Sequence, residues 1–218
     1  MAATAAVTAQ AISVFRPRLI AMLGMCCGFA VEECASPCKF MDVIVVREVS
    51  CWEQGKYVEQ DAETTEFKNR AKPRLVDDII RDKVDLAIEL SEKTLNPALK
   101  RISSQAKFKA IKEKFGEDVR ELPEVRFAPI VTGSSVIADE GMISEICSRH
   151  PSAIGLDMEV FGLYAAAERS VGKRPSVLAI KGVADFGHVA KDDFGQAMAS
   201  TISAEVFKNL LPHLGIFD

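Results

Sequence analysis

Apolar runs that alternate with segments of helical periodicity constrain the fold of this chain most strongly. Four strand-like runs, at residues 19–24, 42–46, 125–131 and 177–183, are mostly apolar, which is typical of strands that are covered on both faces. Between the second and third runs, apolar side chains recur every three or four residues, as on a buried helix face. This alternation predicts an α/β fold, with three α/β/α layers around a central mixed, largely parallel sheet.

Local signals predict the boundaries of the remaining elements. Small residues at 25–28 predict a turn after the first strand, and the second strand is expected beside the first. Residues 52–57 read as a loop with Gly55 at its tip, and Pro97 is expected to divide the region 73–116 into two helices. Further helices are expected at 1–15, 142–149 and 161–168, and a last helix, entered through Asp192 and Asp193, carries Met198, Ile202, Val206 and Leu210 on one stripe.

Composition argues against several classes of function. The 218 residues, 48% of them hydrophobic, suffice for one domain with a full core, and we expect residues 1–218 to form a single domain. The net charge is −4 and basic residues do not alternate with aromatic ones, so nucleic acid is not an expected partner. No apolar stretch approaches the roughly 20 residues that span a bilayer, so no membrane partner is expected either.

The six cysteines indicate the cellular compartment of the protein rather than a metal site. They occur without a secretory signal pattern, which predicts reduced thiols and a cytoplasmic protein. Their spacing is irregular and the three histidines lie far away in the sequence, so we expect no metal site. The cysteine-containing loop at 29–40 has no assigned function.

Carboxylates follow two of the strand-like segments near the C-terminal end. Asp157 and Glu159 follow one segment, and Asp185 follows the other. Since ligands of α/β sheets bind outside the carboxyl ends of the strands, these side chains are predicted to line a pocket together with the turns at 24–28 and 132–135. A carboxylate accepts two hydrogen bonds from adjacent sugar hydroxyls, which suits Glu159. The alternative is that Asp185 is a turn residue or a helix cap, that Glu159 is a charge at the start of a helix and that Met158 is a core residue.

Four segments in this order resemble the nucleoside phosphorylase and methylthioadenosine/adenosylhomocysteine nucleosidase superfamily. They are Met-Leu-Gly-Met-Cys-Cys-Gly at 22–28, Val-Thr-Gly-Ser-Ser-Val-Ile at 131–137, Leu-Asp-Met-Glu-Val-Phe-Gly at 156–162 and Lys-Gly-Val-Ala-Asp-Phe at 181–186. The resemblance covers nearly the whole chain. It implies cleavage of the N-glycosidic bond of a purine nucleoside by a homodimer or a higher homo-oligomer. The motifs are specific for the superfamily but not for the purine or the 5′ substituent.

The resemblance also implies roles for the two carboxylates. Asp185 matches the aspartate that protonates the purine, and Met158 and Glu159 match the pair that contacts ribose. The chemistry requires such groups, because breaking the bond builds positive charge on the sugar and negative charge on the base. The apolar residues Val183 and Ala184 beside Asp185 disfavour its charged form, which suits a proton donor.

The same resemblance places two loops around the ligand. Val136 and Ile137 match the wall of the base site, and Met25, Cys26 and Gly28 match the turn near the sugar and the attacking nucleophile. Family members begin with a further strand and a glycine-containing turn that helps phosphorylases to bind phosphate, so we expect an N-terminally shortened fold. Met25 stands where a Ser or Thr is expected, and a thioether donates no hydrogen bond.

The missing N-terminal strand and turn, and Met25 in place of a Ser or Thr, both favour hydrolysis by water over phosphorolysis. No cofactor is expected, and phosphate would be a co-substrate only in a phosphorylase. A hypothesis from another class is a nucleoside-sensing or interaction module of a larger protein, which keeps the pocket without turning a substrate over.

Overall fold

The computed structural model describes residues 1–31, 34, 36–59, 65–187 and 195–216. Its main sheet contains β1 (Leu19–Gly28), β2 (Val43–Cys51), β5 (Arg74–Leu75), β6 (Val125–Thr132), β7 (Gly155–Asp157) and β8 (Ser176–Asp185), in the order β5-β2-β6-β7-β1-β8. The expected α/β class with a mixed sheet is confirmed. Asp192 and Asp193, which were expected to open the last helix, lie outside the described residues.

The sheet mixes long parallel ladders with shorter antiparallel ones. The β1–β8 and β2–β6 ladders are parallel, and β6 pairs with β7 in the same direction. The start of β2 also pairs antiparallel with β8, at Val43 to Val45, so the strands curve round toward closure. Among the described residues, β1 pairs with β8 along its length, whereas its other edge pairs with a strand only at Cys27 and Gly28.

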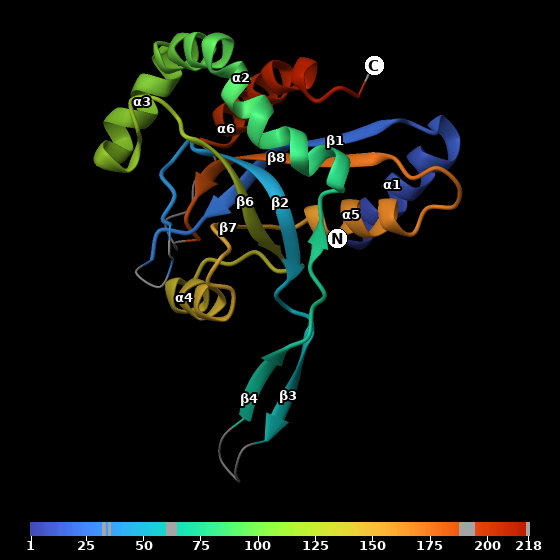
Figure 1. The fold of residues 1–218 in the computed structure, drawn as a ribbon. Helices are drawn as coiled ribbons and strands as arrows, with labels where there is room; N and C mark the ends of the chain where they lie inside the picture. Colours follow the sequence, from blue (N-terminus) through green and yellow to red (C-terminus); the bar gives the residue numbers. More distant parts are fainter. Residues whose placement is uncertain (32–33, 35, 60–64, 188–194, 217–218) are drawn as a thin grey trace.

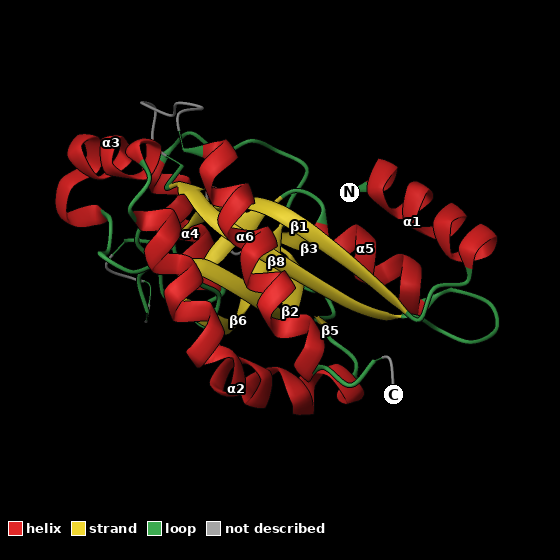
Figure 2. Ribbon diagram, turned by 90° about the horizontal axis from the view of Figure 1, so that it is seen from above, coloured by secondary structure: helices red, strands yellow, loops and turns green. Residues whose placement is uncertain are grey.

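Helices cover both sides of the sheet. On one side, α6 (Gln196–Leu210) packs on β1 and β8, and α2 (Asp78–Ser103) packs on α6, with α3 (Ala106–Phe115) beyond it (Figures 1 and 2). On the other side, α5 (Val160–Glu168) contacts β8 and β2, and α1 (Ala2–Phe15) packs against α5. The stripe on α6 is buried as expected, with Met198, Ile202, Val206 and Leu210 at most 4% exposed. None of the described helices is both long and apolar enough to cross a membrane.

A two-stranded hairpin projects from this body. It consists of β3 (Gly55–Glu59) and β4 (Thr65–Asn69), and Figure 1 shows it extending away from the main sheet. At its base, Phe67 lies against Arg149 and Asn69 contacts His150, both at the end of α4 (Glu140–Arg149). The expected loop at 52–57 is therefore wrong, since only the residues before Gly55 turn.

Three other sequence expectations are wrong. Residues 25–28 are not a turn but the end of β1, because Met25 to Cys27 stay paired with β8 through a bulge and Gly28 pairs with Gly155 of β7. The second strand does not lie beside the first, because β7 and β8 occupy that place. Pro97 does not end a helix: α2 runs through it to Ser103, and Leu95, Ala98 and Leu99 on its inner face are buried, so tertiary packing offsets the lost hydrogen bond.

Candidate functional site

The loop after β6, the ends of β7 and β8 and the last residues of β1 meet around one cavity of about 90 Å³. Its lining contains Met25, Cys26, Cys27, Ser135, Val136, Ile137, Leu156, Asp157, Met158, Glu159 and Asp185. Seven of the eight residues that the sequence proposed for the site are in this set. Segments up to 160 residues apart in the sequence therefore come together as the strand-end argument predicted.

Gly28 is the exception. It lines neither this cavity nor the adjoining one, as the described residues form them. A Cβ atom at this position would lie 2.7 Å from Cγ1 of Val183 and 2.9 Å from Cβ of Cys38. The structure thus explains this glycine by close packing between strands rather than by ligand contact.

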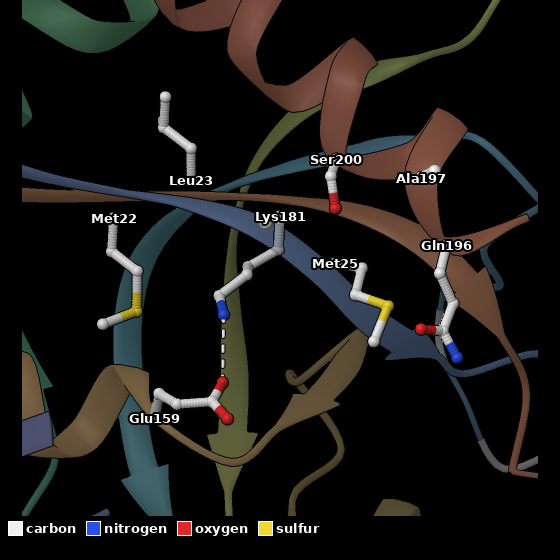
Figure 3. Close-up of a pocket in the computed structure, with 9 residues that line it drawn as sticks. Met22, Leu23, Met25, Glu159, Lys181, Gln196, Ala197 and Ser200 are labelled. Carbon is white, nitrogen blue, oxygen red and sulfur yellow. Dashed lines mark hydrogen bonds and ion pairs between the residues drawn. The ribbon is translucent and has the colours of Figure 1, made fainter. Parts of the chain in front are cut away.

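A second, more open cavity of about 620 Å³ adjoins the first. Figure 3 shows most of its lining: Met22, Leu23 and Met25 from β1, Lys181 from β8, Gln196, Ala197 and Ser200 from α6, and Glu159 just before α5. Gly24 of β1 also lines it. Met25 and Glu159 line both cavities. Together the two spaces fall within the several hundred Å³ that small-molecule sites usually enclose.

A buried ion pair lies beneath Glu159. Nζ of Lys181 lies 3.0 Å from Oδ2 of Asp157 and 3.2 Å from Oε2 of Glu159, toward which it points in Figure 3. The Lys181 and Asp157 side chains are 4% and 1% exposed, whereas that of Glu159 is 45% exposed. Burial acts to lower the pKa of Lys181, but Asp157 and Glu159 outweigh it, so this pKa is raised. Glu159 therefore has one oxygen near a fixed cation while its carboxylate reaches the cavity.

Asp157 organises the backbone around this pair. Its carboxylate accepts hydrogen bonds from the backbone N–H groups of Glu159, at 3.2 Å, and Val160, at 3.0 Å, at the start of α5. It also accepts one from Oγ1 of Thr132, at 2.5 Å, and Thr132 in turn accepts one from the N–H of Phe161. The position of Glu159 is thus fixed by buried charge and hydrogen bonds.

Asp185 is the last residue of β8 and is 7% exposed. Its Oδ1 accepts a hydrogen bond from the backbone N–H of Gly187, at 3.0 Å. Val183, Ala184 and Phe186 are buried, so the apolar surroundings expected from the sequence are present. Such a carboxyl group at the edge of a cavity is suited to hydrogen bonding with a bound ligand.

The wall formed by residues 135–137 is much more open than the Glu159 side. Val136 is 63% exposed and Ser135 is also exposed, while Ile137 is partly buried. Across the cavity, Cys26 is buried, and burial raises the pKa of its thiol well above the usual value. Cys26 is therefore a neutral, small lining residue rather than a reactive thiolate.

Sequence reasoning missed Lys181 as part of the site. A signal was available, because a lysine in the middle of the apolar run 177–183 needs a buried counter-charge. Among the described residues, no group of three or more His, Cys, Asp or Glu side chains is placed to hold a metal ion.

Comparison with known proteins adds remote relatives. No family model matches the chain. It is 27% identical over 210 residues to the uncharacterized protein y4jS of Sinorhizobium fredii, covering 94% of this chain and 45% of that protein. It is 24% identical over 208 residues to the ATP nucleosidase Cap17 of Escherichia coli, covering 95% of this chain and 38% of that protein. The chain thus spans less than half the length of these curated relatives.

Solved structures match more completely. A methylthioadenosine/S-adenosylhomocysteine nucleosidase of Neisseria meningitidis, in complex with methylthio-immucillin-A, superimposes with a TM-score of 0.64 at 16% identity, over 95% of this chain and 75% of that one. The nucleosidase of Colwellia psychrerythraea, in complex with adenine, gives 0.65 at 18% identity, over 97% and 74%. Futalosine hydrolase of Helicobacter pylori gives 0.59 at 12% identity, over 96% and 74%. The chain therefore has the nucleoside phosphorylase-like fold of the methylthioadenosine/S-adenosylhomocysteine nucleosidases.

Proposed function

We propose that this chain hydrolyses the N-glycosidic bond of a purine nucleoside or a closely related ribosyl compound. One observation carries the proposal: Asp185, the Met158–Glu159 pair and the wall from Ser135 to Ile137 line a single cavity. Two of the solved structures of the same fold carry adenine or methylthio-immucillin-A, and one curated relative is an ATP nucleosidase. These ligands support a purine as the leaving group.

Each residue has a task in the proposed reaction. The carboxyl group of Asp185 donates a proton to the departing base as the bond between C1′ and the base nitrogen breaks. The carboxylate of Glu159 accepts hydrogen bonds from ribose hydroxyls and stabilises the positive charge that develops on the sugar. A water oxygen forms the new bond to C1′, and a proton from this water restores the carboxyl group of Asp185. The products are the free base and ribose or its 5′ derivative.

The second cavity favours substrates with a substituent beyond the ribose. It begins at Met25 and Glu159, where the first cavity ends, and it is larger and more open. Its lining mixes apolar side chains with Lys181, Gln196 and Ser200. We therefore include 5′-substituted nucleosides and nucleotides among the proposed substrates.

The remaining parts of the proposal concern the whole protein. Six buried cysteines, none of them in a disulfide, support a reducing, cytoplasmic setting. The proposed reaction uses no cofactor, and we propose that the protein acts as a homodimer or a higher homo-oligomer, as the family resemblance implies.

Measurement of free-base release by chromatography tests the proposal. The substrates are adenosine, inosine, guanosine, methylthioadenosine, adenosylhomocysteine, AMP and ATP, each with and without phosphate. We expect release without phosphate, and a loss of roughly 10²- to 10⁴-fold in kcat for Asp185→Asn, which removes the proton donor. The matched control is Asp82→Asn on the exposed face of α2, which should leave kcat unchanged.

Three other outcomes would each revise the proposal in a defined way. Strict dependence on phosphate would identify a phosphorylase. Undiminished turnover by Asp185→Asn would remove Asp185 from the mechanism. Tight adenine binding without any base release would favour a nucleoside-sensing module.

A further inference from the structure

We infer that Glu53, which follows β2, is a positioning residue that fixes the loop at residues 133–137. Residues 135–137 of this loop form the base wall. The inference rests on the proposed function in one respect, namely that this wall contacts the base. Glu53 is not among the cavity-lining residues. It acts through the loop that supplies three of them, Ser135, Val136 and Ile137.

The carboxylate of Glu53 holds the loop with both oxygens. Oε2 accepts a hydrogen bond from the backbone N–H of Ser134 at 2.8 Å, and Oε1 accepts one from Oγ of Ser135 at 3.0 Å. Two hydrogen bonds to one carboxylate fix direction as well as distance. Glu53 is 81 residues from Ser134 in the sequence, so these bonds join the end of β2 to the loop after β6.

Trp52 contacts the start of the same loop. Its backbone N–H donates to the carbonyl oxygen of Thr132 at 3.1 Å. A Cβ atom on Gly133 would lie 2.0 Å from Nε1 of Trp52, so only a glycine fits against the indole ring. The loop thus begins against the indole ring of Trp52 and is then held by the carboxylate of Glu53.

Ile137 at the end of this wall packs against a core cluster that includes Ile143 and Ile146, whereas the residues before it have fewer contacts in the described structure. Ser134, Ser135 and Val136 are exposed to solvent. Gly133 donates to the carbonyl oxygen of Asp157 at 3.1 Å, and the next hydrogen bonds along the loop are the two to Glu53. Removal of the Glu53 carboxylate therefore leaves Ser134, Ser135 and Val136 free to move away from a bound base, while Ile137 stays packed on the core.

The first test compares Glu53→Ala with Glu59→Ala, a matched change on the exposed hairpin strand β3. Loss of two hydrogen bonds to a charged group should raise KM and the Kd for adenine by roughly tenfold each, with kcat within about threefold of the wild type. Ser135→Ala, which removes one of the two bonds, should give an intermediate rise of about threefold. Glu59→Ala should match the wild type in all three quantities.

A second readout needs no turnover. Trp52 is the one tryptophan of the chain, so its fluorescence reports on the contact with Gly133. Acrylamide should quench Trp52 more strongly in Glu53→Ala than in Glu59→Ala, at unchanged Tm. This measurement separates the two hypotheses: quenching that responds to Glu53 in a protein that releases no base would refute the proposed function but retain the role of Glu53 in ordering the loop.

The inference is overturned if KM, adenine affinity and quenching in Glu53→Ala all equal those of Glu59→Ala. It is also overturned if Glu53→Ala lowers kcat and Tm together without a change in adenine affinity, because Glu53 would then be a general stabilising residue.

Discussion

The two sides of the candidate site are held by different kinds of contact. On the side of Glu159, a buried ion pair of Asp157 and Lys181, at most 4% exposed, fixes the start of α5. On the side of the base wall, Glu53 holds Ser134 and Ser135 through exposed hydrogen bonds. Both sides use one carboxylate to order a backbone segment, but only the first does so out of contact with water.

This difference predicts unequal rigidity. Breaking a buried charge pair costs about 3–5 kcal/mol because a charge is left unpaired, whereas exposed hydrogen bonds and ion pairs contribute about 1 kcal/mol or less. The side proposed to bind ribose should therefore hold one geometry, and the side proposed to bind the base should tolerate substitution. A change of base preference is then expected to require fewer compensating changes than a change of the sugar.

The largest expected effect is that of Lys181→Met. This change keeps much of the side-chain volume but leaves Asp157 buried without its cation, so we expect a loss of about 3–5 kcal/mol in the free energy of unfolding. Unfolding in denaturant measures this loss. Lys173→Met, at an exposed position, is the matched control and should change stability by less than about 0.5 kcal/mol. A loss below 1 kcal/mol for Lys181→Met would mean that the two sides do not differ as proposed.

An intermediate effect is expected for Thr132→Val, which is nearly isosteric. It removes the donor to Asp157 and the acceptor for the N–H of Phe161, so the expected loss is about 1–2 kcal/mol. Thr201→Val on the exposed face of α6 is the control. Because Thr132 and Lys181 share Asp157, the double variant should deviate from additivity, and strict additivity would show that the contacts act separately.

The smallest expected effect is on the hairpin beside the base side. Burial, with a contribution from Arg149, lowers the pKa of His150 below its usual 6.5, and Nε2 of His150 lies 2.8 Å from Nδ2 of Asn69. The unfolded state therefore binds the proton more readily, so this contribution to stability is present above pH 6.5 and is lost as pH falls through the lowered pKa.

Hydrogen exchange measures this loss. Once corrected for the intrinsic pH dependence, exchange of the β3–β4 amides should be about threefold faster at pH 5.5 than at pH 7, with no such change in β8. In His150→Gln the pH dependence should vanish. Equal acceleration of β8 would instead indicate global destabilisation.

The sequence predicted the buried elements better than the exposed ones. The buried strand β8 and the stripe of α6 were predictable because apolar periodicity reports burial directly. The hairpin was missed because its two exposed strands do not alternate clearly between apolar and polar residues. They contain the charged residues Lys56, Glu59, Glu66 and Lys68. Asp185 and Glu159 were recognisable from their place after apolar strands.

Two site-ordering residues were harder to find. Lys181 left a signal inside an apolar run, but its partners were knowable only from the fold. Glu53 left none, because its contacts lie 81 and 82 residues further along the chain. Boundary errors at 25–28 and at Pro97 arose where tertiary packing overrode local preference.

All six cysteines are buried and none forms a disulfide, which has a practical consequence for following the protein's motions. Burial, opposed in part by Arg126, raises the pKa of Cys38 to about 12. On the order of one Cys38 thiol in 10⁵ is then a thiolate at pH 7, so alkylation of the native state should be very slow. The rate at which a thiol reagent modifies Cys38 therefore measures how often the core around Cys38 opens, without an engineered cysteine.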